Sequence, residues 1–228
     1  MIPAFKQIDT EDIYTIPIID DGSALYAVTD RPFLRVRAAY YEQKIKGAIA
    51  TCFLRPEVLS RLERVAHDIE RQTGWHMLIL DGWRPTAVQQ ALYEDIFRAI
   101  CKKYPQESEA QHHHRTLEFV ALPSKNPLRP SPHLTGGSVD VALCDADGKL
   151  IDMGSGFDEP TTRSYTDAYE HQAGPIRERR RLLYEAMIKE GFTNLPTEWW
   201  HYDFGNQNWA YFSGNAQAIY GPTYPDSY

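Results

Sequence analysis

Hydrophobic residues recur at helical spacing in three stretches of this chain. The first follows Arg55 and ends before Gly74, with Pro56 in the first turn, where proline is well tolerated. The second covers roughly Pro85–Cys101, and the third roughly Pro175–Glu190. Each stretch has one apolar side and is predicted to be a helix that packs on a core.

Shorter apolar runs between these helices predict strands. His76–Leu80 has the composition of a buried strand, and Phe33–Arg37 alternates apolar and basic residues as a half-buried strand does. The predicted strands are 25–28, 33–37, 76–80, 138–144 and 198–204, the last with an aromatic tail that reaches Phe212. Because helices come early and late and strands cluster in the middle, we predict an α+β fold in one domain, residues 1–228.

Length and charge limit the classes of function. A chain of 228 residues can bury a full core. Its formal net charge of −7 argues against nucleic acid as the main partner, because phosphate binding needs a basic surface. The basic run Arg177–Arg181 lies in the third predicted helix and is interpreted as a solvated helix face.

Compartment is indicated by the cysteines and the N-terminus. Cys52, Cys101 and Cys144 are widely spaced and form neither a disulfide framework nor a Cys-x-x-Cys metal pair. The first residues are acidic where a signal peptide has an apolar core, and no run approaches the length of a membrane span. We therefore expect a cytoplasmic protein with no membrane partner; the oligomeric state stays open.

Residues 102–130 are polar and rich in proline, and we expect an irregular insertion there. The adjacent histidines His112–His114 cannot all bind one ion from a regular element, because neighbouring side chains point apart. They are interpreted as part of a solvated segment, with a weak accessory metal contact as the alternative.

Candidate chemistry begins in Ser131–Asp140. Asp140 lies inside the apolar run of a predicted strand, and an unpaired buried carboxylate is costly. A metal, an arginine or a hydrogen-bonded turn would satisfy it. Gly136-Gly137 allows a sharp turn that lets His133 and Asp140 converge, although a histidine in a loop is often only a hydrogen-bonding residue.

Glu198 and His201 add a second carboxylate and a second imidazole. In a regular strand they would point to opposite faces, so the backbone must leave strand geometry near Trp199 if both serve one site. Otherwise they are incidental members of an aromatic strand. Two histidines and one carboxylate with an open fourth position are the usual plan of a catalytic zinc site, and a further glutamate beside it is a candidate general base.

Arg84 follows the buried strand at residues 76–80, between Trp83 and Pro85. A guanidinium there can bind a carboxylate or stabilise an oxyanion. A structural ion pair is the alternative.

Four motifs together resemble the D-alanyl-D-alanine dipeptidase (VanX-like) family of zinc peptidases. The pattern Ser-x-His-x-x-Gly-x-(Ala)-x-Asp is met by Ser131, His133, Gly136 and Asp140, with Ser138 where alanine is usual. The other three motifs are Glu198-x-Trp200-His201, Gly82-Trp83-Arg84-Pro85 and the Met153-Gly154…Phe157-Asp158 segment. The motifs fall within about residues 50–205.

The resemblance implies roles for these residues. His133, Asp140 and His201 would bind one zinc ion, with Glu198 as the catalytic base. Arg84 would stabilise the oxyanion, while Ser131 and Asp158 would contact the dipeptide, Asp158 near its amino group. The implied fold, shared with the hedgehog signalling domain, is a central antiparallel sheet flanked by helices.

One departure concerns the amino end of the substrate. The family usually has a tyrosine in a Leu-Arg-Tyr-Ala-Thr segment, and Val36 occupies that place here. Tyr40 or Tyr41 could substitute in space. The departure concerns the dipeptide specificity and touches neither the metal ligands nor the base.

Three functions fit the sequence. The first is a zinc dipeptidase that hydrolyses D-alanyl-D-alanine or a similar dipeptide. The second is a D,D-carboxypeptidase acting on longer peptidoglycan peptides, for which an open cleft and export would be usual. The third is a non-catalytic zinc-binding module, which would need neither Glu198 as a base nor Arg84 as an oxyanion donor.

Overall fold

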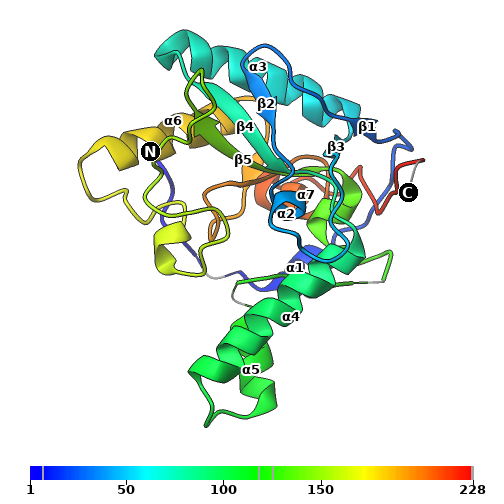
Figure 1. The fold of residues 1–228 in the computed structure, drawn as a ribbon. Coiled ribbons are helices and arrows are strands. Elements are labelled where there is room, and N and C mark those ends of the chain that lie inside the picture. Colours follow the sequence, from blue (N-terminus) through cyan, green and yellow to red (C-terminus); the bar gives the residue numbers. More distant parts are fainter. Residues whose placement is uncertain (7, 118, 125, 227–228) are drawn as a thin grey trace.

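The centre of the molecule is a five-stranded sheet with the strand order β2-β4-β5-β7-β6 (Figure 1). The computed structural model describes residues 1–6, 8–117, 119–124 and 126–226. The strands of this sheet are β2 (Leu34–Val36), β4 (His76–Asp81), β5 (Ser138–Cys144), β6 (Thr193–Asn194) and β7 (His201–Asp203). Strand β1 (Tyr26–Ala27) pairs with β3 (Phe53–Leu54) in a separate two-stranded sheet.

Helices flank the sheet. Helices α3 (Pro56–Thr73) and α6 (Pro175–Lys189) pack against each other and against the sheet (Figure 1). The others are α1 (Thr10–Tyr14), α2 (Ala39–Glu42), α4 (Thr86–Lys103), α5 (Glu109–Thr116), α7 (Gln207–Ser213) and the 3-10 helices η1 (Pro132–Thr135) and η2 (Thr162–Ser164). The predicted α+β fold in one domain is confirmed.

Most of the predicted elements form where the hydrophobic pattern places them. Helix α3 buries the side chains that recur at helical spacing, and Gly74 ends it in the left-handed conformation, with φ +74°. Strand β5 has the predicted bounds, and all of its residues are buried. Val139, Val141 and Leu143 point away from Asp140 into the hydrophobic core.

The sheet differs from the expected antiparallel arrangement at one edge. Strand β2 pairs in parallel with β4, whereas β4, β5, β7 and β6 pair antiparallel. A parallel neighbour requires a crossover, and α3 lies in the connection between these two strands.

A β-bulge in β4 places Asp81 on the same face of the sheet as Asp140. The pairing of β4 with β5 shifts between Ile79 and Asp81, so that Asp81 lies opposite Asp140. Regular alternation would have placed Asp81 on the same face as Ile79, in the core. The bulge turns the carboxylate of Asp81 to the face of the sheet that carries Asp140.

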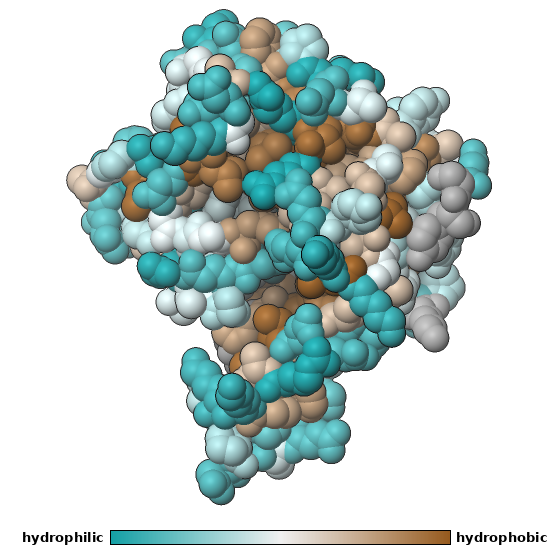
Figure 2. Space-filling view, viewed as in Figure 1, coloured by the Kyte–Doolittle hydropathy of each residue, from teal (hydrophilic) through white to brown (hydrophobic). Residues whose placement is uncertain are grey.

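Helices α4 and α5 form an arm that projects from the body, with hydrophilic residues at its tip (Figures 1 and 2). The predicted irregular insertion is therefore partly wrong, since α4 reaches Lys103 and α5 follows. His112 is buried with its Nε2 2.8 Å from the Tyr104 carbonyl, and His113 stacks on Phe97. These two histidines are packing residues of the arm, and only His114 fits the predicted solvated role.

Two further expectations are wrong. The aromatic tail after the last strand is the helix α7, capped by Asn206, whose side chain accepts from the Trp209 N–H. In the basic run of α6, Arg180 is buried and not solvated. Within the described residues, no helix is long and apolar enough to cross a membrane.

Candidate metal centre and active site

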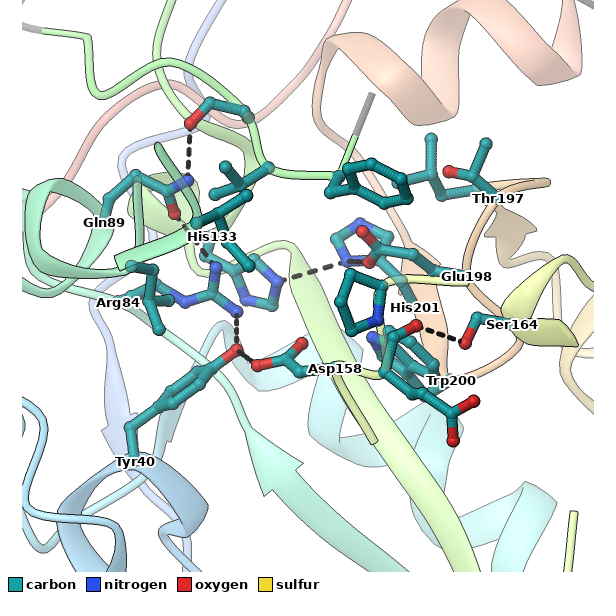
Figure 3. A pocket seen from close by; sticks show the side chains of 18 of the residues that line it. Tyr40, Arg84, Gln89, His133, Asp158, Ser164, Thr197, Glu198, Trp200 and His201 are labelled. Carbon is teal, nitrogen blue, oxygen red and sulfur yellow. Dashed lines mark hydrogen bonds and ion pairs between the residues drawn. The ribbon is translucent and has the colours of Figure 1, made fainter. Parts of the chain in front are cut away.

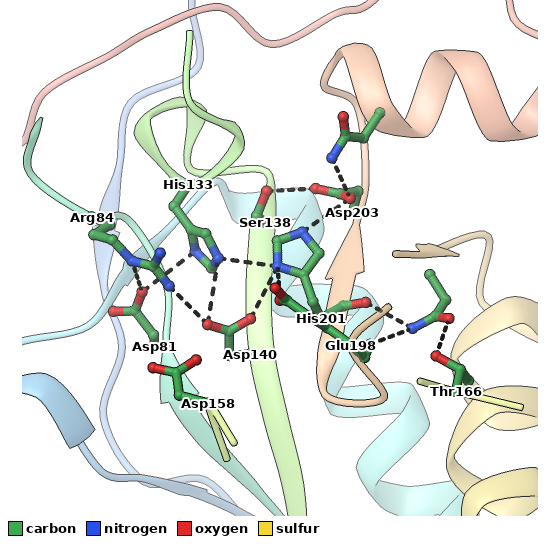
Figure 4. Close-up of polar contacts among 12 residues, drawn as sticks. Asp81, Arg84, His133, Ser138, Asp140, Asp158, Thr166, Glu198, His201 and Asp203 are labelled. Atoms are coloured by element: carbon green, nitrogen blue, oxygen red, sulfur yellow. Dashed lines mark hydrogen bonds and ion pairs between the residues drawn. The ribbon is translucent and has the colours of Figure 1, made fainter. Parts of the chain in front are cut away.

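Three buried side chains converge above the middle of the sheet. His201 lies directly opposite Asp140 in the pairing of β5 with β7, and His133 reaches the same point from η1 (Figure 4). His201 Nδ1 lies 3.1 Å from Asp140 Oδ1 and 3.2 Å from His133 Nε2. His133 Nε2 is 3.4 Å from Asp140 Oδ2.

The glycine turn orients His133 as predicted. Gly136 follows η1 in the left-handed conformation, with φ +69°, and a Cβ there would lie 2.2 Å from Leu25. The ring of His133 donates its Nδ1–H to the Gly82 carbonyl at 2.7 Å. This bond fixes the tautomer and leaves Nε2 unprotonated towards Asp140 and His201.

The backbone leaves strand geometry between Glu198 and His201, as the sequence requires if both serve one site. Strand β7 starts only at His201, and Trp199-Trp200 form a turn. The Asn194 amide donates to the carbonyls of Glu198 and His201, at 3.0 and 2.9 Å, and fixes this turn. Glu198 Oε2 thereby comes within 3.8 Å of His201 Nδ1.

Arg84 is buried and held on every side of its guanidinium. Its Nε donates to Asp81 at 2.8 Å, its Nη1 to Gln89 at 2.9 Å, and its Nη2 to Asp140 at 3.0 Å. The Arg84 backbone N–H also donates to the His133 carbonyl at 3.3 Å. The charge of Arg84 is therefore fixed beside the converging side chains.

A cavity of about 280 Å³ lies over this cluster (Figure 3). Arg84, His133, Asp158, Glu198 and His201 all line it. Its wall is completed by apolar residues of α4 and of the segment after α5, namely Leu92, Ile96, Phe119 and Val120. Five of the seven residues singled out in the sequence are therefore brought together around one space, and Asp140 lies beneath it.

Asp158 is held in the cavity by Tyr40. The Tyr40 hydroxyl donates to Asp158 Oδ2 at 2.6 Å and accepts from Arg84 Nη2 at 3.1 Å. Tyr40 is 3% exposed, whereas Tyr41 is 54% exposed, so Tyr40 is the tyrosine that reaches the site. The sequence left this choice open.

Burial and neighbouring charges shift the pKa values of the carboxylates in the site. It raises the pKa of Glu198 to about 8 and that of Asp158 to about 6. For Asp140, burial also raises the pKa, but the facing rings of His133 and His201 outweigh it and the net shift is downward. A cation among these groups would lower the pKa of Glu198 towards the range of a general base at neutral pH.

Ser131 is the exception among the predicted residues. It precedes η1, is buried, and its hydroxyl donates to the Leu122 carbonyl at 3.4 Å. Its neighbour Pro132 lines the cavity instead. A contact between Ser131 and a substrate stays a prediction.

Asp81 is a site residue that the sequence interpretation missed. Besides Arg84 Nε, its Oδ2 lies 3.5 Å from His133 Nδ1. Burial raises the pKa of Asp81. A usable signal was present, because Asp81 ends an apolar strand directly before the Gly-Trp-Arg-Pro turn.

The model of a family described as D-ala-D-ala dipeptidase matches residues 24–222. The chain belongs to this family. The match extends beyond the motifs at residues 50–205, and the predicted relationship is confirmed. By this membership the chain is an enzyme, a metallopeptidase.

Curated relatives agree with the family match. A D-alanyl-D-alanine dipeptidase of Synechocystis is 30% identical over 222 residues, which cover 86% of this chain and 87% of that protein. A D-alanyl-D-alanine dipeptidase of Escherichia coli K12 is 30% identical over 155 residues, covering 68% of this chain and 67% of that protein.

Among solved structures, the chain is similar to VanXYg, a vancomycin resistance D,D-dipeptidase in complex with a D-Ala-D-Ala phosphinate analogue. The identity is 18% and the TM-score 0.41, over 91% of this chain and 70% of that one. The chain is also similar to VanYB in complex with D-alanine-D-alanine. The identity is 18% and the TM-score 0.43, over 72% of this chain and 79% of that one.

The donor set fits a tetrahedral metal. Bond lengths of about 2.0–2.1 Å to nitrogen and oxygen imply ligand atoms about 3.3 Å apart. His133 Nε2 and His201 Nδ1 lie 3.2 Å apart, and the two oxygens of Asp140 lie 3.1 Å from His201 Nδ1 and 3.4 Å from His133 Nε2. One ligand atom from each of the three buried side chains lies within 4.8 Å of the other two. Two imidazoles and one carboxylate suit Zn²⁺ and related divalent ions.

Proposed function

We propose that this chain is a zinc-dependent dipeptidase that hydrolyses D-alanyl-D-alanine or a similar dipeptide to free amino acids. The observation that carries the proposal is the set of three buried donor side chains that converge on one point, beside a cavity that also holds Glu198, Arg84 and Asp158. A non-catalytic module would gain nothing from a base and a guanidinium fixed beside a metal site.

In this proposal, His133, Asp140 and His201 hold one zinc ion. When bound, the ion would polarise the scissile carbonyl and lower the pKa of the attacking water. His133 would use Nε2, because its Nδ1–H is committed to Gly82. His201 would use Nδ1, the nitrogen that faces the other two donors.

Glu198 acts as the general base. Its carboxylate lies beside the three donors without being one of them, so it can accept a proton from the attacking water. As the carbon–nitrogen bond breaks, the same carboxyl passes this proton to the nitrogen of the departing amino acid.

Arg84 stabilises the negative charge that develops on the carbonyl oxygen. Its guanidinium is already oriented by Asp81 and Gln89, so little reorganisation is needed during the reaction. A fixed donor of this kind is worth most in a site from which water is excluded.

Asp158 pairs with the ammonium group of the dipeptide. Asp158 has a left-handed backbone, with φ +57°, and Tyr40 fixes its carboxylate at the cavity wall. A buried ammonium needs such a partner, because an unpaired charge away from water is costly. This arrangement favours substrates with a free amino end close to the scissile bond.

A cytoplasmic location is part of the proposal. The free thiols of Cys52, Cys101 and Cys144 support it, since unpaired cysteines are usual in a reducing compartment.

The test is the release of free alanine from D-Ala-D-Ala, L-Ala-L-Ala and a pentapeptide ending in D-Ala-D-Ala, with and without chelator. We expect cleavage of the D,D-dipeptide alone, lost with chelator and restored by Zn²⁺. Cleavage of the pentapeptide at a similar rate would replace the proposal with a carboxypeptidase. Bound zinc without any cleavage would leave only a binding module.

A further inference from the structure

Asp203 is a buried carboxylate at the end of β7, two residues after His201, and the mechanism above does not use it. Four donors surround its two oxygens, and Figure 4 shows Ser138 and His201 among them. Ser138 Oγ and Asn206 Nδ2 donate to Oδ1, at 2.5 and 2.6 Å. Asn208 Nδ2 and His201 Nε2 donate to Oδ2, both at 3.1 Å.

Both ring nitrogens of His201 lie 3.1 Å from a carboxylate oxygen, Nδ1 from Asp140 and Nε2 from Asp203. A neutral imidazole has one N–H and one lone pair, so a ring that binds a cation through Nδ1 carries its proton on Nε2, where the carboxylate of Asp203 accepts it. The lone pair is then on Nδ1, the atom that faces Asp140 and His133. The opposite tautomer would direct an N–H at the metal centre and could not bind a cation.

The support of Asp203 comes from two other elements. Ser138 is the first residue of β5, at the position where alanine is usual in the family motif, and its hydroxyl also accepts from Asn206 Nδ2 at 2.9 Å. Asn206 accepts from the Trp209 N–H at 3.0 Å and so caps α7. The carboxylate is thereby fixed between β5, β7 and the start of α7.

We propose that Asp203, held by Ser138, Asn206 and Asn208, is a positioning residue that locks His201 in its metal-binding tautomer and so sets the affinity of the site for zinc. Partners of this kind around a metal-binding histidine typically change metal affinity about 10- to 100-fold when they are lost. The inference rests on the metal site proposed above.

The experiment measures the dissociation constant of Zn²⁺ for the full chain by competition with a chromogenic chelator. In Asp203→Asn, the amide can donate to His201 Nε2 and so favour the wrong tautomer. We expect Zn²⁺ to bind about 10- to 100-fold more weakly. The ¹⁵N chemical shifts of the Zn²⁺-bound wild-type chain should show the proton of His201 on Nε2, hydrogen-bonded to Asp203, and this signature should change in Asp203→Asn.

Two other variants separate positioning from stability. Ser138→Ala keeps Asp203 and removes one of its donors, so we expect a loss of zinc affinity of roughly twofold to tenfold. Glu170→Gln alters another buried carboxylate, which accepts from Arg181 Nε at 3.0 Å and does not line the cavity. It should lower the melting temperature of the metal-free chain and leave zinc affinity unchanged.

The outcomes are distinct. Zinc affinity within twofold of wild type in both Asp203→Asn and Ser138→Ala would overturn the inference and leave the metal site standing. Equal weakening in Glu170→Gln would also overturn it, because the effect would then follow stability. Failure of the wild-type chain to bind Zn²⁺ would overturn the metal site together with this inference.

Discussion

Glu198 and Glu159 both line the cavity, but only Glu198 lies beside the three donor side chains. We expect Glu198→Gln to lower kcat by about 10²- to 10⁴-fold, the usual contribution of a general base. Zinc content should stay unchanged, because Glu198 is not one of the three donors. Steady-state release of alanine and metal analysis of the purified protein measure the two quantities.

Glu159→Gln is the matched control for this substitution. The Glu159 carboxylate accepts from the Gly156 N–H at 3.0 Å and from Thr161 at 2.9 Å, and so is committed to its own loop. This variant should retain most of the activity. If Glu198→Gln were as active as Glu159→Gln, the general base would have to be another group.

Tyr40 and Tyr41 provide a second comparison at the scale of single residues. Tyr40→Phe removes the hydroxyl that bonds Asp158 and Arg84. A hydrogen bond to a charged group contributes about 1.5–3 kcal/mol, so kcat/KM for the dipeptide should fall by roughly 10- to 100-fold. Tyr41→Phe alters an exposed ring and should leave kcat/KM unchanged. Equal kinetics of the two variants would remove Tyr40 from the site.

The sequence could not distinguish these two tyrosines for a physical reason. Neighbours in a helix point about 100° apart, so only one of them can face the site. Which one does so depends on how α2 packs against β4, and this is a tertiary contact between distant parts of the chain. In contrast, His133, Asp140 and His201 were found because each stands in an unusual local setting, next to glycines, valines or tryptophans.

At the scale of elements, α6 supports the loop that carries Asp158. Arg180 on this helix donates to the carbonyls of Met153, Arg163 and Tyr165, at 2.7, 2.9 and 2.8 Å. Burial lowers the pKa of Arg180 to about 10, so the guanidinium stays charged at neutral pH. One side chain thus fixes both ends of the Asp158 loop.

Arg180→Leu should lower the free energy of unfolding by about 3–5 kcal/mol, because three carbonyls lose their donor. KM should rise as well, since the position of Asp158 depends on this loop. Arg179→Leu is the control: Arg179 is half-buried, donates to one carbonyl, that of Asp152, and lies over the Trp75 ring, so a smaller change of about 1 kcal/mol is expected. Urea unfolding measures both variants, and equal losses would contradict the role of Arg180.

Elements with a strong local pattern were predictable, and those defined by packing were not. Helix α3 and strand β5 follow from periodicity and flanking glycines alone. The aromatic residues before Ser213 gave no helical period, yet α7 forms because Asn206 caps it. The bulge that turns Asp81 towards the site is likewise a property of the pairing with β5, not of the local sequence.

On the scale of the whole molecule, segments near the two ends of the chain meet beside Arg55, the residue that precedes α3. Ile18 pairs with Ala218 in an isolated bridge. Buried Arg55 donates to Asp20 Oδ2 at 2.8 Å and to the Gly221 carbonyl at 3.2 Å. It also donates to the Thr135 carbonyl at 2.9 Å, at the end of η1. The termini are therefore connected to the segment that presents His133.

Because Asp20 takes part in these contacts, the free energy of unfolding should depend on pH through its carboxyl group. Partial burial raises the pKa of Asp20, but the N–H groups of Gly221 and Gly22 and the guanidinium of Arg55 outweigh it, and the net shift is downward. A carboxyl whose pKa is lower in the folded state stabilises the fold above its unfolded pKa of about 3.9. That stabilisation is lost as the pH falls through the lowered folded value.

Asp20→Asn should therefore be less stable than wild type by a constant amount between pH 7 and about pH 5.5, and the difference should shrink below about pH 4. Urea unfolding across this range measures it. Asp147→Asn, in the exposed turn at residues 145–149, is the control and should stay within about 0.5 kcal/mol of wild type at pH 7. A difference for Asp20→Asn that grows as the pH falls would mean that the carboxylate of Asp20 does not hold the two ends together.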